Sequence, residues 1–456
     1  MWGSRISSKV LSVVKVRRCL AALALALCCA TLFGFDRVPK PDFETDYSIP
    51  ELTTPNPRSA ALEYLDLAVF VVFQAAAVYF AIKLRRRILL AWLSAASVAY
   101  FGFFRKGCVC PVGATQNITL ALFQPEYLIP LVVILFFIIP IITTLLFGRT
   151  FCAAVCPLGA VQDLVVFKPV SVPPWLAKPL GFLPVLYLGF AVLFAATGSE
   201  FIICRYDPFV SLFRLGGSFE ILLLGAIFIV LGLFIPRPYC RFFCPYGLLL
   251  SWVSRLSKRH VTITPDECIQ CKLCEKACPV DAIDGTTLPS SSSALREDKK
   301  RASLVLLIAP FVVAAGGLLG YGIHQPLSSM HPTVITAKRV HLEESGLATG
   351  MTLRSETFRA SKNTQEALFT EADDIIKQFR FGATVLGVFI GIMISISFLG
   401  LFRHERRTDY APNRANCVSC GRCFSYCPRE HLRRSKQPRD KPAATAAVPI
   451  DGDRRS

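Results

Sequence analysis

Eight cysteines stand in two runs that share one spacing. In each run three cysteines are separated by two residues, and a fourth follows after three residues and precedes a proline. Thiolates at such short gaps can wrap one corner of an iron–sulfur cubane, while the fourth points away and can reach a second cluster. The first run holds Cys268, Cys271, Cys274 and Cys278, and the second holds Cys417, Cys420, Cys423 and Cys427. The spacing therefore predicts two [4Fe-4S] clusters.

Zinc is the alternative metal for sets of four cysteines, but zinc motifs usually come as two separated Cys pairs. Two identical four-membered runs of the bacterial ferredoxin type favour iron–sulfur. We expect a split module in which each cluster takes three thiolates from one run and the fourth from the other. The expected sets are Cys268, Cys271, Cys274 and Cys427, and Cys417, Cys420, Cys423 and Cys278. If each run closed its own cluster, the two modules would be separate.

A second cysteine pattern, Cys-Pro-x-Gly, occurs three times at the end of an apolar stretch, as in an internal repeat. The proline suits the first turn of a helix, so the thiol would lie near a helix N-terminus, which favours thiolate. The cysteines concerned are Cys108 and Cys110, Cys152 and Cys156, and Cys240 and Cys244. We expect the last four to converge as a third, thiolate-bound metal centre. Cys108 and Cys110, with Cys204, would lie near the outer surface, either as a metal site or as small buried residues.

The composition indicates a membrane protein. Of 456 residues 53% are hydrophobic and 18% charged, and the mean hydropathy is +0.48. The net charge of +18 comes from basic clusters at the ends of apolar stretches, where topology signals lie, so we expect no nucleic-acid partner. The 18 cysteines do not indicate a small secreted disulfide scaffold, because the chain is long and apolar. No acid–base pair or nucleophile triad is recognisable.

Eight stretches are apolar and long enough to be membrane-span candidates. They cover roughly 19–35, 65–82, 88–104, 126–147, 180–197, 219–236, 302–323 and 381–402. Basic clusters at 83–87, 296–301 and 403–407 place these loops inside, with both termini cytoplasmic. Arg105 and Lys106 fall outside under this count, against the trend. The expected fold is an α-helical polytopic membrane protein with a small split α+β bacterial-ferredoxin-like module.

The same reading divides the chain into segments. We expect an N-terminal anchor and short periplasmic segment, a helical core with the three repeats, the two halves of the ferredoxin module, a pair of spans around a periplasmic loop, and a disordered tail. The anchor and periplasmic segment cover 1–64 and the helical core covers 65–257. The two halves of the ferredoxin module cover 258–290 and 403–431. The pair of spans covers 302–402, with the loop at 324–380, and the tail covers 432–456.

At Phe147 to Gly159 and at Pro238 to Gly247, followed by the first ferredoxin run, the chain resembles the NosR/NapH-type membrane polyferredoxins. The resemblance covers about 85–430. It implies an inner-membrane protein whose cytoplasmic clusters exchange electrons with the quinone pool or a cytoplasmic donor, and with periplasmic reductases or their maturation machinery. NosR-type members carry a large flavin-binding domain where this chain has only 36–64. That short segment lacks a covalent-flavin threonine motif, which disfavours direct FMN binding and implies a separate flavoprotein or periplasmic partner.

Two functions follow. The first is membrane electron transfer, in which the clusters and the thiolate centre form a route through the bilayer, with membrane lipid, redox proteins and quinone as partners. Such a protein would be an electron carrier or a component of a quinol dehydrogenase. The second is a copper-handling or redox-sensing assembly protein, in which the Cys-x3-Cys-Pro pairs bind soft cuprous ion. The sequence identifies no quinone pocket.

Overall fold

The computed structural model describes residues 59–107, 110–263, 268–287, 292–348, 350–360, 364–402, 407 and 409–436. The predicted first span at 19–35 and Cys108 lie outside the described residues, as does the tail from residue 437. The start of the predicted disordered tail, by contrast, belongs to a helix, α22 (Pro428–Lys436). The fold is mostly helical, with a single two-stranded sheet among the described residues.

Five helical stretches in the described part of the chain are long and apolar enough to cross a membrane. They are α2 (Ala60–Val78) with η1 (Tyr79–Lys83), α3 (Arg87–Ser97) with η2 (Val98–Phe104), α8 (Pro174–Leu180) with α9 (Leu183–Ala196), α16 (Ser292–Gly322) and α20 (Gln365–Leu401). A sixth is formed if α11 (Pro208–Arg214) and α12 (Phe219–Phe234), bent by 104°, make one span. The described residues thus do not reproduce the predicted count of eight, because α5 (Leu131–Phe147) has only 17 residues and the first stretch lies outside them.

The core repeats one arrangement four times: an apolar helix, a short connecting segment, and a short helix that begins at a proline. The returning helices are α4 (Pro111–Phe123), α7 (Pro157–Val165), α11 and α14 (Pro245–Ser254), which follow η2, α5, α9 and α12. Three connections contain a five-residue helix, α6 (Thr150–Ala154), α10 (Ile202–Tyr206) or α13 (Pro238–Phe242). Buried aromatic side chains from these elements and from α2, such as Phe70 of α2, Phe151 and Tyr246, form one continuous core.

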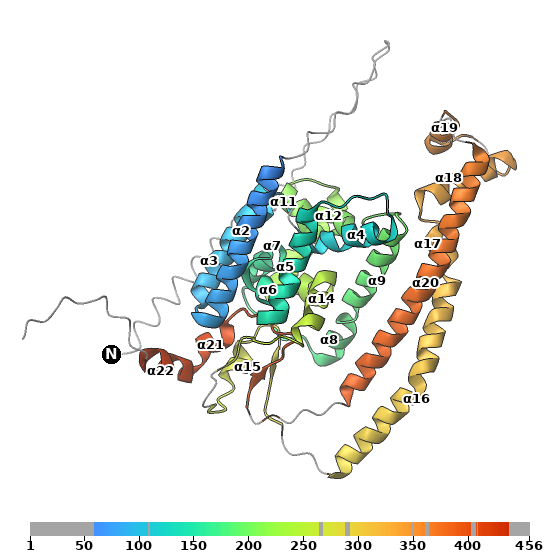
Figure 1. The fold of residues 1–456 in the computed structure, drawn as a ribbon. Coiled ribbons are helices and arrows are strands. Elements are labelled where there is room, and N and C mark those ends of the chain that lie inside the picture. Colours follow the sequence, from blue (N-terminus) through green and yellow to red (C-terminus); the bar gives the residue numbers. More distant parts are fainter. Residues whose placement is uncertain are drawn as a thin grey trace, which may run out of the picture.

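Figure 1 shows α2 and α3 along one edge of the molecule and the long helices α16 and α20 side by side along the opposite edge. Small residues permit the close approach of α16 and α20: methyl groups on Gly316 or Gly387 would overlap the backbone of the facing helix. Such small-residue contacts are typical of helix pairs in membranes. Leu386 of α20 packs against Gly189 of α9 and so joins this pair to the core.

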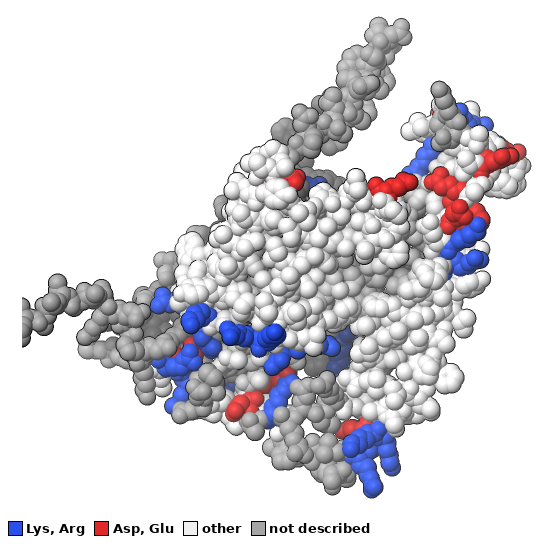
Figure 2. Space-filling view, in the orientation of Figure 1, with Lys and Arg blue, Asp and Glu red and all other residues white. Residues whose placement is uncertain are grey.

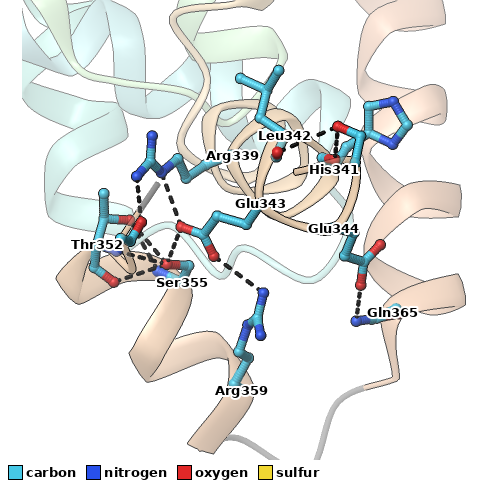
Figure 3. Close-up of polar contacts among 11 residues, drawn as sticks. Arg339, His341, Leu342, Glu343, Glu344, Thr352, Ser355, Arg359 and Gln365 are labelled. Atoms are coloured by element: carbon cyan, nitrogen blue, oxygen red, sulfur yellow. Dashed lines mark hydrogen bonds and ion pairs between the residues drawn. The ribbon is translucent and has the colours of Figure 1, made fainter. Parts of the chain in front are cut away.

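Helix α20 has 37 residues and would be about 55 Å long, well beyond the roughly 30 Å hydrocarbon core. Its projecting end carries α17 (His324–Ser328), α18 (Pro332–Glu344) and α19 (Leu353–Ala360), so the predicted loop 324–380 is a helical cap. Glu343 holds this cap together. Its carboxylate accepts hydrogen bonds from Ser355 and Arg339 and pairs with Arg359 at 3.1 Å, as Figure 3 shows.

The two ferredoxin halves meet at the other end of the molecule. Strand β1 (Ile283–Asp284) pairs antiparallel with β2 (Ala411–Pro412), so that Ile283 faces Pro412. Helix α15 (Leu273–Ala277) of the first half lies against α21 (Arg422–Tyr426) of the second. The chain between the halves contains α16 and α20, which carry it away from the module and back to it (Figure 1). The module is therefore one unit built from two distant stretches.

Charged side chains gather at the ends of the molecule and leave a broad uncharged belt between them (Figure 2). Lys and Arg dominate the rim beside the ferredoxin module, whereas the opposite end also exposes Asp and Glu. Arg105, which the predicted topology places on the outer side, forms a 2.8 Å ion pair with buried Asp66. Its charge is therefore compensated within the protein.

Candidate metal centres

The two cysteine runs adopt the same backbone path. Gln270 and Lys272 flank Cys271 with φ of 49° and 58°, and Ser419 and Gly421 flank Cys420 with φ of 53° and 74°. Left-handed backbone is uncommon for residues other than glycine and concentrates at functional sites. Alternating left- and right-handed residues turn successive amide groups toward one side and create a concavity for an anion. The fold thus shapes each run around a negatively charged group.

Each cavity of the module gathers four thiols. Cys268, Cys271, Cys274 and Cys427 line one cavity together with Ile263 and Tyr410. Cys278, Cys417, Cys420 and Cys423 line another, between Val280 and Val418. These are the two sets that the sequence analysis grouped, with the fourth thiol crossing over from the other run. Four thiols around one cavity form a donor set that suits a cubane cluster.

No three His, Cys, Asp or Glu side chains among the described residues converge closely enough to hold a single metal ion. A cubane places its four irons at separate corners, and each iron takes its own thiolate, so its ligands stand wider apart than those of one zinc ion. The spacing of the thiols is therefore compatible with a polynuclear centre.

Burial opposes ionisation of the module's thiols. It raises the pKa of Cys417 to about 12 and that of Cys274 to about 11. The amide of Ala282 donates a 3.2 Å hydrogen bond to Cys278 Sγ and partly offsets this effect. Positive metal charge lowers the pKa of a ligating thiol, so these cysteines are poised to ionise when iron binds.

The four cysteines of the Cys-x3-Cys-Pro pairs form a separate group between the membrane helices. Cys156 and Cys244 belong to one buried cluster, Cys152 packs against it, and a methyl group on Gly159, three residues after Cys156, would lie 3.7 Å from Cys240 Sγ. Cys156 and Cys244 are the N-cap residues of α7 and α14, and the Gly247 amide donates a 3.2 Å hydrogen bond to Cys244 Sγ. The structure thus brings these four side chains together, and we refer to them as the inner thiol group.

Polar side chains surround the inner thiol group. Gln162 donates a 3.3 Å hydrogen bond from Nε2 to Cys240 Sγ and accepts one at Oε1 from the Tyr239 amide. The guanidinium of Arg237, only 2% exposed, donates to the carbonyl oxygens of Cys152 and, at 3.3 Å, Ala153. Hydrogen-bond donors and positive charge near sulfur ligands tune an iron–sulfur centre.

The inner thiol group lies directly against the second module cavity. Cys152 packs on the same small apolar cluster as Cys278, Cys417 and Cys420, formed by Val280, Ala282 and Val418. Arg149 bridges the two sites, because its Nη2 lies 3.9 Å from Cys152 Sγ and its Nη1 donates a 3.0 Å hydrogen bond to the Ala415 carbonyl. The inner thiol group and the second module cavity are therefore neighbours and are not separated by the thickness of a membrane.

The remaining predicted residues are placed differently. Cys110 is half-buried at the N-terminus of α4, and Cys204 is exposed within α10. Cys110 packs against the main buried cluster of the helical core, which also contains Cys244 of the inner thiol group. Cys110 therefore lies in the helical core and not only at its outer surface.

Two ion-pair sites escaped the sequence analysis. Arg85 pairs at 2.9 Å with Glu430, three residues after Cys427, and stacks on the ring of Phe424. Asp163, directly after Gln162, pairs at 3.1 Å with Arg422 of the second run. Both join the module to the membrane helices.

Comparison with known proteins agrees with this site. Two family models, each described as a 4Fe-4S binding domain, match residues 129–178 with 218–264, and residues 261–284. The first match contains both Cys-x3-Cys-Pro pairs and the second contains the first ferredoxin run. No solved structure matches the chain.

Three curated relatives are similar over parts of their length. The uncharacterized protein MJ0750 of Methanocaldococcus jannaschii is 30% identical over 40% of this chain and 77% of its own. The putative electron transport protein YccM of Escherichia coli is 31% identical over 30% of this chain, and Protein NirI of Paracoccus denitrificans is 29% identical over 44%. The chain spans only 43% and 31% of these two relatives. Apolar helices, 4Fe-4S domains and these relatives together place the chain in the family of NosR/NapH-type membrane polyferredoxins.

Proposed function

We propose that this protein carries electrons through a series of iron–sulfur clusters that leads from an aqueous module into the membrane. The contact between Cys152 and the apolar cluster around Cys417 carries this proposal, because it joins a membrane-embedded thiol group to a ferredoxin cavity. A bare hydrocarbon core of about 30 Å insulates, so a route through it requires carriers inside it. The name of YccM, a putative electron transport protein, supports the same role.

In this proposal the module cavities hold two [4Fe-4S] clusters and the inner thiol group holds a third centre. The 4Fe-4S domain match over 129–178 and 218–264 supports iron–sulfur for this third centre. When bound, the clusters supply one-electron redox chemistry. The chain's own residues supply spacing through packed helices, positive charge from Arg149 and Arg237, and hydrogen bonds from Gln162 and Gly247.

The proposed location is the bacterial inner membrane, with the ferredoxin module in the cytoplasm. The Lys and Arg rim beside the module supports this orientation, because basic loops remain on the cytoplasmic side (Figure 2). The helical cap on α20 would then lie in the periplasm. Electrons would pass between the module and the quinone pool or a periplasmic or flavoprotein partner, in the service of a respiratory reductase or its maturation.

The proposal is tested by a redox titration followed by EPR on anaerobically purified full-length protein. We expect about eight irons from the module, with further iron from the inner centre, and reversible signals. The Cys152→Ala/Cys244→Ala double variant should lose one centre and keep the two module signals. Stoichiometric copper that disappears in this variant would support the copper-handling function instead, and zinc without visible absorbance would overturn both.

A further inference from the structure

The membrane core is an inverted repeat, and several residues around the inner thiol group have counterparts in its other half. Helix α4 packs on α9 and α10 as α7 packs on α12 and α13, and α11 packs on η2 as α14 packs on α5. The pair α4 and α11 therefore makes the same kinds of contact with its neighbouring helices as the pair α7 and α14 does. Because successive spans run in opposite directions, the two pairs approach from opposite sides of the membrane. Binding sites between such repeats are a common feature of membrane proteins.

A glutamine marks the equivalent place in both pairs. Gln116 Oε1 accepts a 2.9 Å hydrogen bond from the Ile203 amide, directly before Cys204. Gln162 Oε1 accepts one of 3.1 Å from the Tyr239 amide, directly before Cys240. The repeat therefore equates Cys204 with Cys240.

A glycine one turn earlier repeats this correspondence. A methyl group on Gly113 would lie 3.0 Å from Cys204 Sγ, and one on Gly159 would lie 3.7 Å from Cys240 Sγ. Both glycines follow a Cys-Pro step, at Cys110 and Cys156. The absence of a side chain leaves room beside each sulfur, and the repeat equates Cys110 with Cys156.

Asp207 occupies the place of Cys244. Each precedes a proline and caps the helix that follows: Asp207 Oδ1 accepts a 3.3 Å hydrogen bond from the Val210 amide, as Cys244 Sγ accepts one of 3.2 Å from the Gly247 amide. An aspartate replaces a cysteine here, which is why the motif is not recognisable as a fourth Cys-Pro repeat in the sequence.

Among the described residues at this site, a buried amide donor has no hydrogen-bond partner, and a buried carboxylate that accepts hydrogen bonds from the Phe209 and Val210 amides has no cationic partner. Gln116 is 1% exposed, and its Nε2 donor has no hydrogen-bond partner, whereas Nε2 of Gln162 donates to Cys240 Sγ. Asp207 is 2% exposed, and no described Lys or Arg forms an ion pair with its carboxylate. A buried carboxylate without a cation, and a buried amide without an acceptor, are both costly. A metal centre with sulfur ligands would satisfy both groups.

We propose that Cys110, Cys204 and Asp207 are ligands of an outer iron–sulfur cluster, the symmetry counterpart of the centre at the inner thiol group, and that Gln116 donates a hydrogen bond to it. An iron–sulfur cluster is favoured because the inner counterpart of this site lies within the match to a 4Fe-4S binding domain. The N-terminus of the 13-residue α4 adds a positive dipole end that favours the anionic ligand set.

The outer site continues the electron route and therefore rests on the proposed function. The ring of Tyr239, directly before Cys240 of the inner group, lies 5.4 Å (centroid to centroid) from the ring of Phe209, two residues after Asp207 of the outer site, so the two sites adjoin through this aromatic pair. One electron would pass from the reduced inner centre to the oxidised outer cluster, with no bond made or broken. Cys204 is exposed, so a redox partner on the membrane face opposite the ferredoxin module would receive the electron there.

The test counts iron, acid-labile sulfide and EPR-active centres in full-length protein purified anaerobically and held in lipid nanodiscs. Cys204→Ala and Asp207→Ala should each lose one cluster, about two to four irons, and keep the two ferredoxin signals. Asp207→Cys should keep the iron and lower the midpoint potential of one centre only, because thiolate replaces carboxylate. Gln116→Leu should keep the iron and shift the potential of that same centre.

Cys240→Ala, which removes the inner counterpart, and Cys19→Ala, which lies in the predicted first span, serve as matched controls. The second should leave iron and spectra unchanged. Full iron content in both Cys204→Ala and Asp207→Ala, or equal potentials in Asp207→Cys and the parent, would overturn the outer cluster while leaving the proposed function intact. If the parent protein itself showed no ferredoxin signals, this result would instead contradict the proposed function.

Discussion

Arg149 Nη2 lies 3.9 Å from Cys152 Sγ, while the same guanidinium donates through Nη1 to the carbonyl oxygen of Ala415. Ala415 precedes Cys417 by two residues, and Cys417 lines the second module cavity. One buried positive charge therefore serves two candidate clusters. A reduced cluster carries one more negative charge than an oxidised one, so Arg149 should favour reduction of both centres.

Replacement of Arg149 by Gln should lower the midpoint potential of the inner centre. We expect a tenfold or greater loss of stabilisation of the reduced state, which corresponds to about 59 mV for a one-electron couple. Potentiometric EPR titration measures it. Arg255→Gln removes an exposed arginine close in sequence to α14 and should leave both potentials unchanged. Equal shifts in the two variants would show that Arg149 acts only through overall charge.

The Arg85–Glu430 ion pair should anchor the second half of the module to the membrane helices. Both side chains are nearly buried, at 10% and 2% exposure. Removal of one partner leaves an uncompensated buried charge, which typically costs about 3–5 kcal/mol. Arg85→Met should therefore lower the temperature at which the clusters lose their visible absorbance. Arg85→Met/Glu430→Leu should recover part of this loss.

The exposed pair of Lys377 and Asp373 is a suitable comparison, at 55% and 63% exposure. Lys377→Ala should leave the bleaching temperature close to that of the parent protein, because exposed ion pairs contribute little to stability. A similar bleaching temperature for Arg85→Met and Lys377→Ala would argue against a structural role for the buried pair.

Close packing of α16 and α20 should depend on Gly387. A methyl group there would overlap the backbone of Gly316 on the facing helix. We expect Gly387→Ala to destabilise the helix pair by about 1–3 kcal/mol, the usual cost of overpacking, measured as earlier thermal aggregation in detergent. Gly400→Ala on the same helix adds its methyl group to open space and should behave as the parent protein. If both variants unfold at the same temperature, the small-residue contact contributes nothing.

The sequence predicted correctly the helical membrane class and the ferredoxin-type runs, because hydropathy and cysteine spacing are local signals. It could not reveal the Arg85–Glu430 pair, whose partners are far apart in the chain and meet only through the fold. It also did not reveal that Asp207 corresponds to Cys244, because an aspartate stands where the repeat otherwise has a cysteine. The described residues give five or six of the eight predicted spans, because the first predicted span lies outside them, α5 has only 17 residues, and α11 and α12 are bent by 104°. Average hydropathy registers neither a short helix nor a bend.

The helical cap on α20 should loosen in acid because of Glu343. The hydrogen bond from Ser355, with the charges of Arg339 and Arg359, lowers the pKa of this carboxyl group below its ordinary value (Figure 3). A carboxyl whose pKa is lower in the folded state stabilises that state above the unfolded pKa of 4.5, and the contribution disappears as the pH falls through the folded value. Hydrogen exchange of residues 353–360 in the full-length protein should therefore accelerate, after correction for intrinsic rates, between neutral pH and pH values below 4.5. In Glu343→Gln the exchange should be faster already at neutral pH and should lose most of this pH dependence, while Glu356→Gln, on the exposed face of α19, should retain it. An unchanged pH profile in Glu343→Gln would assign the acid response of the cap to another group.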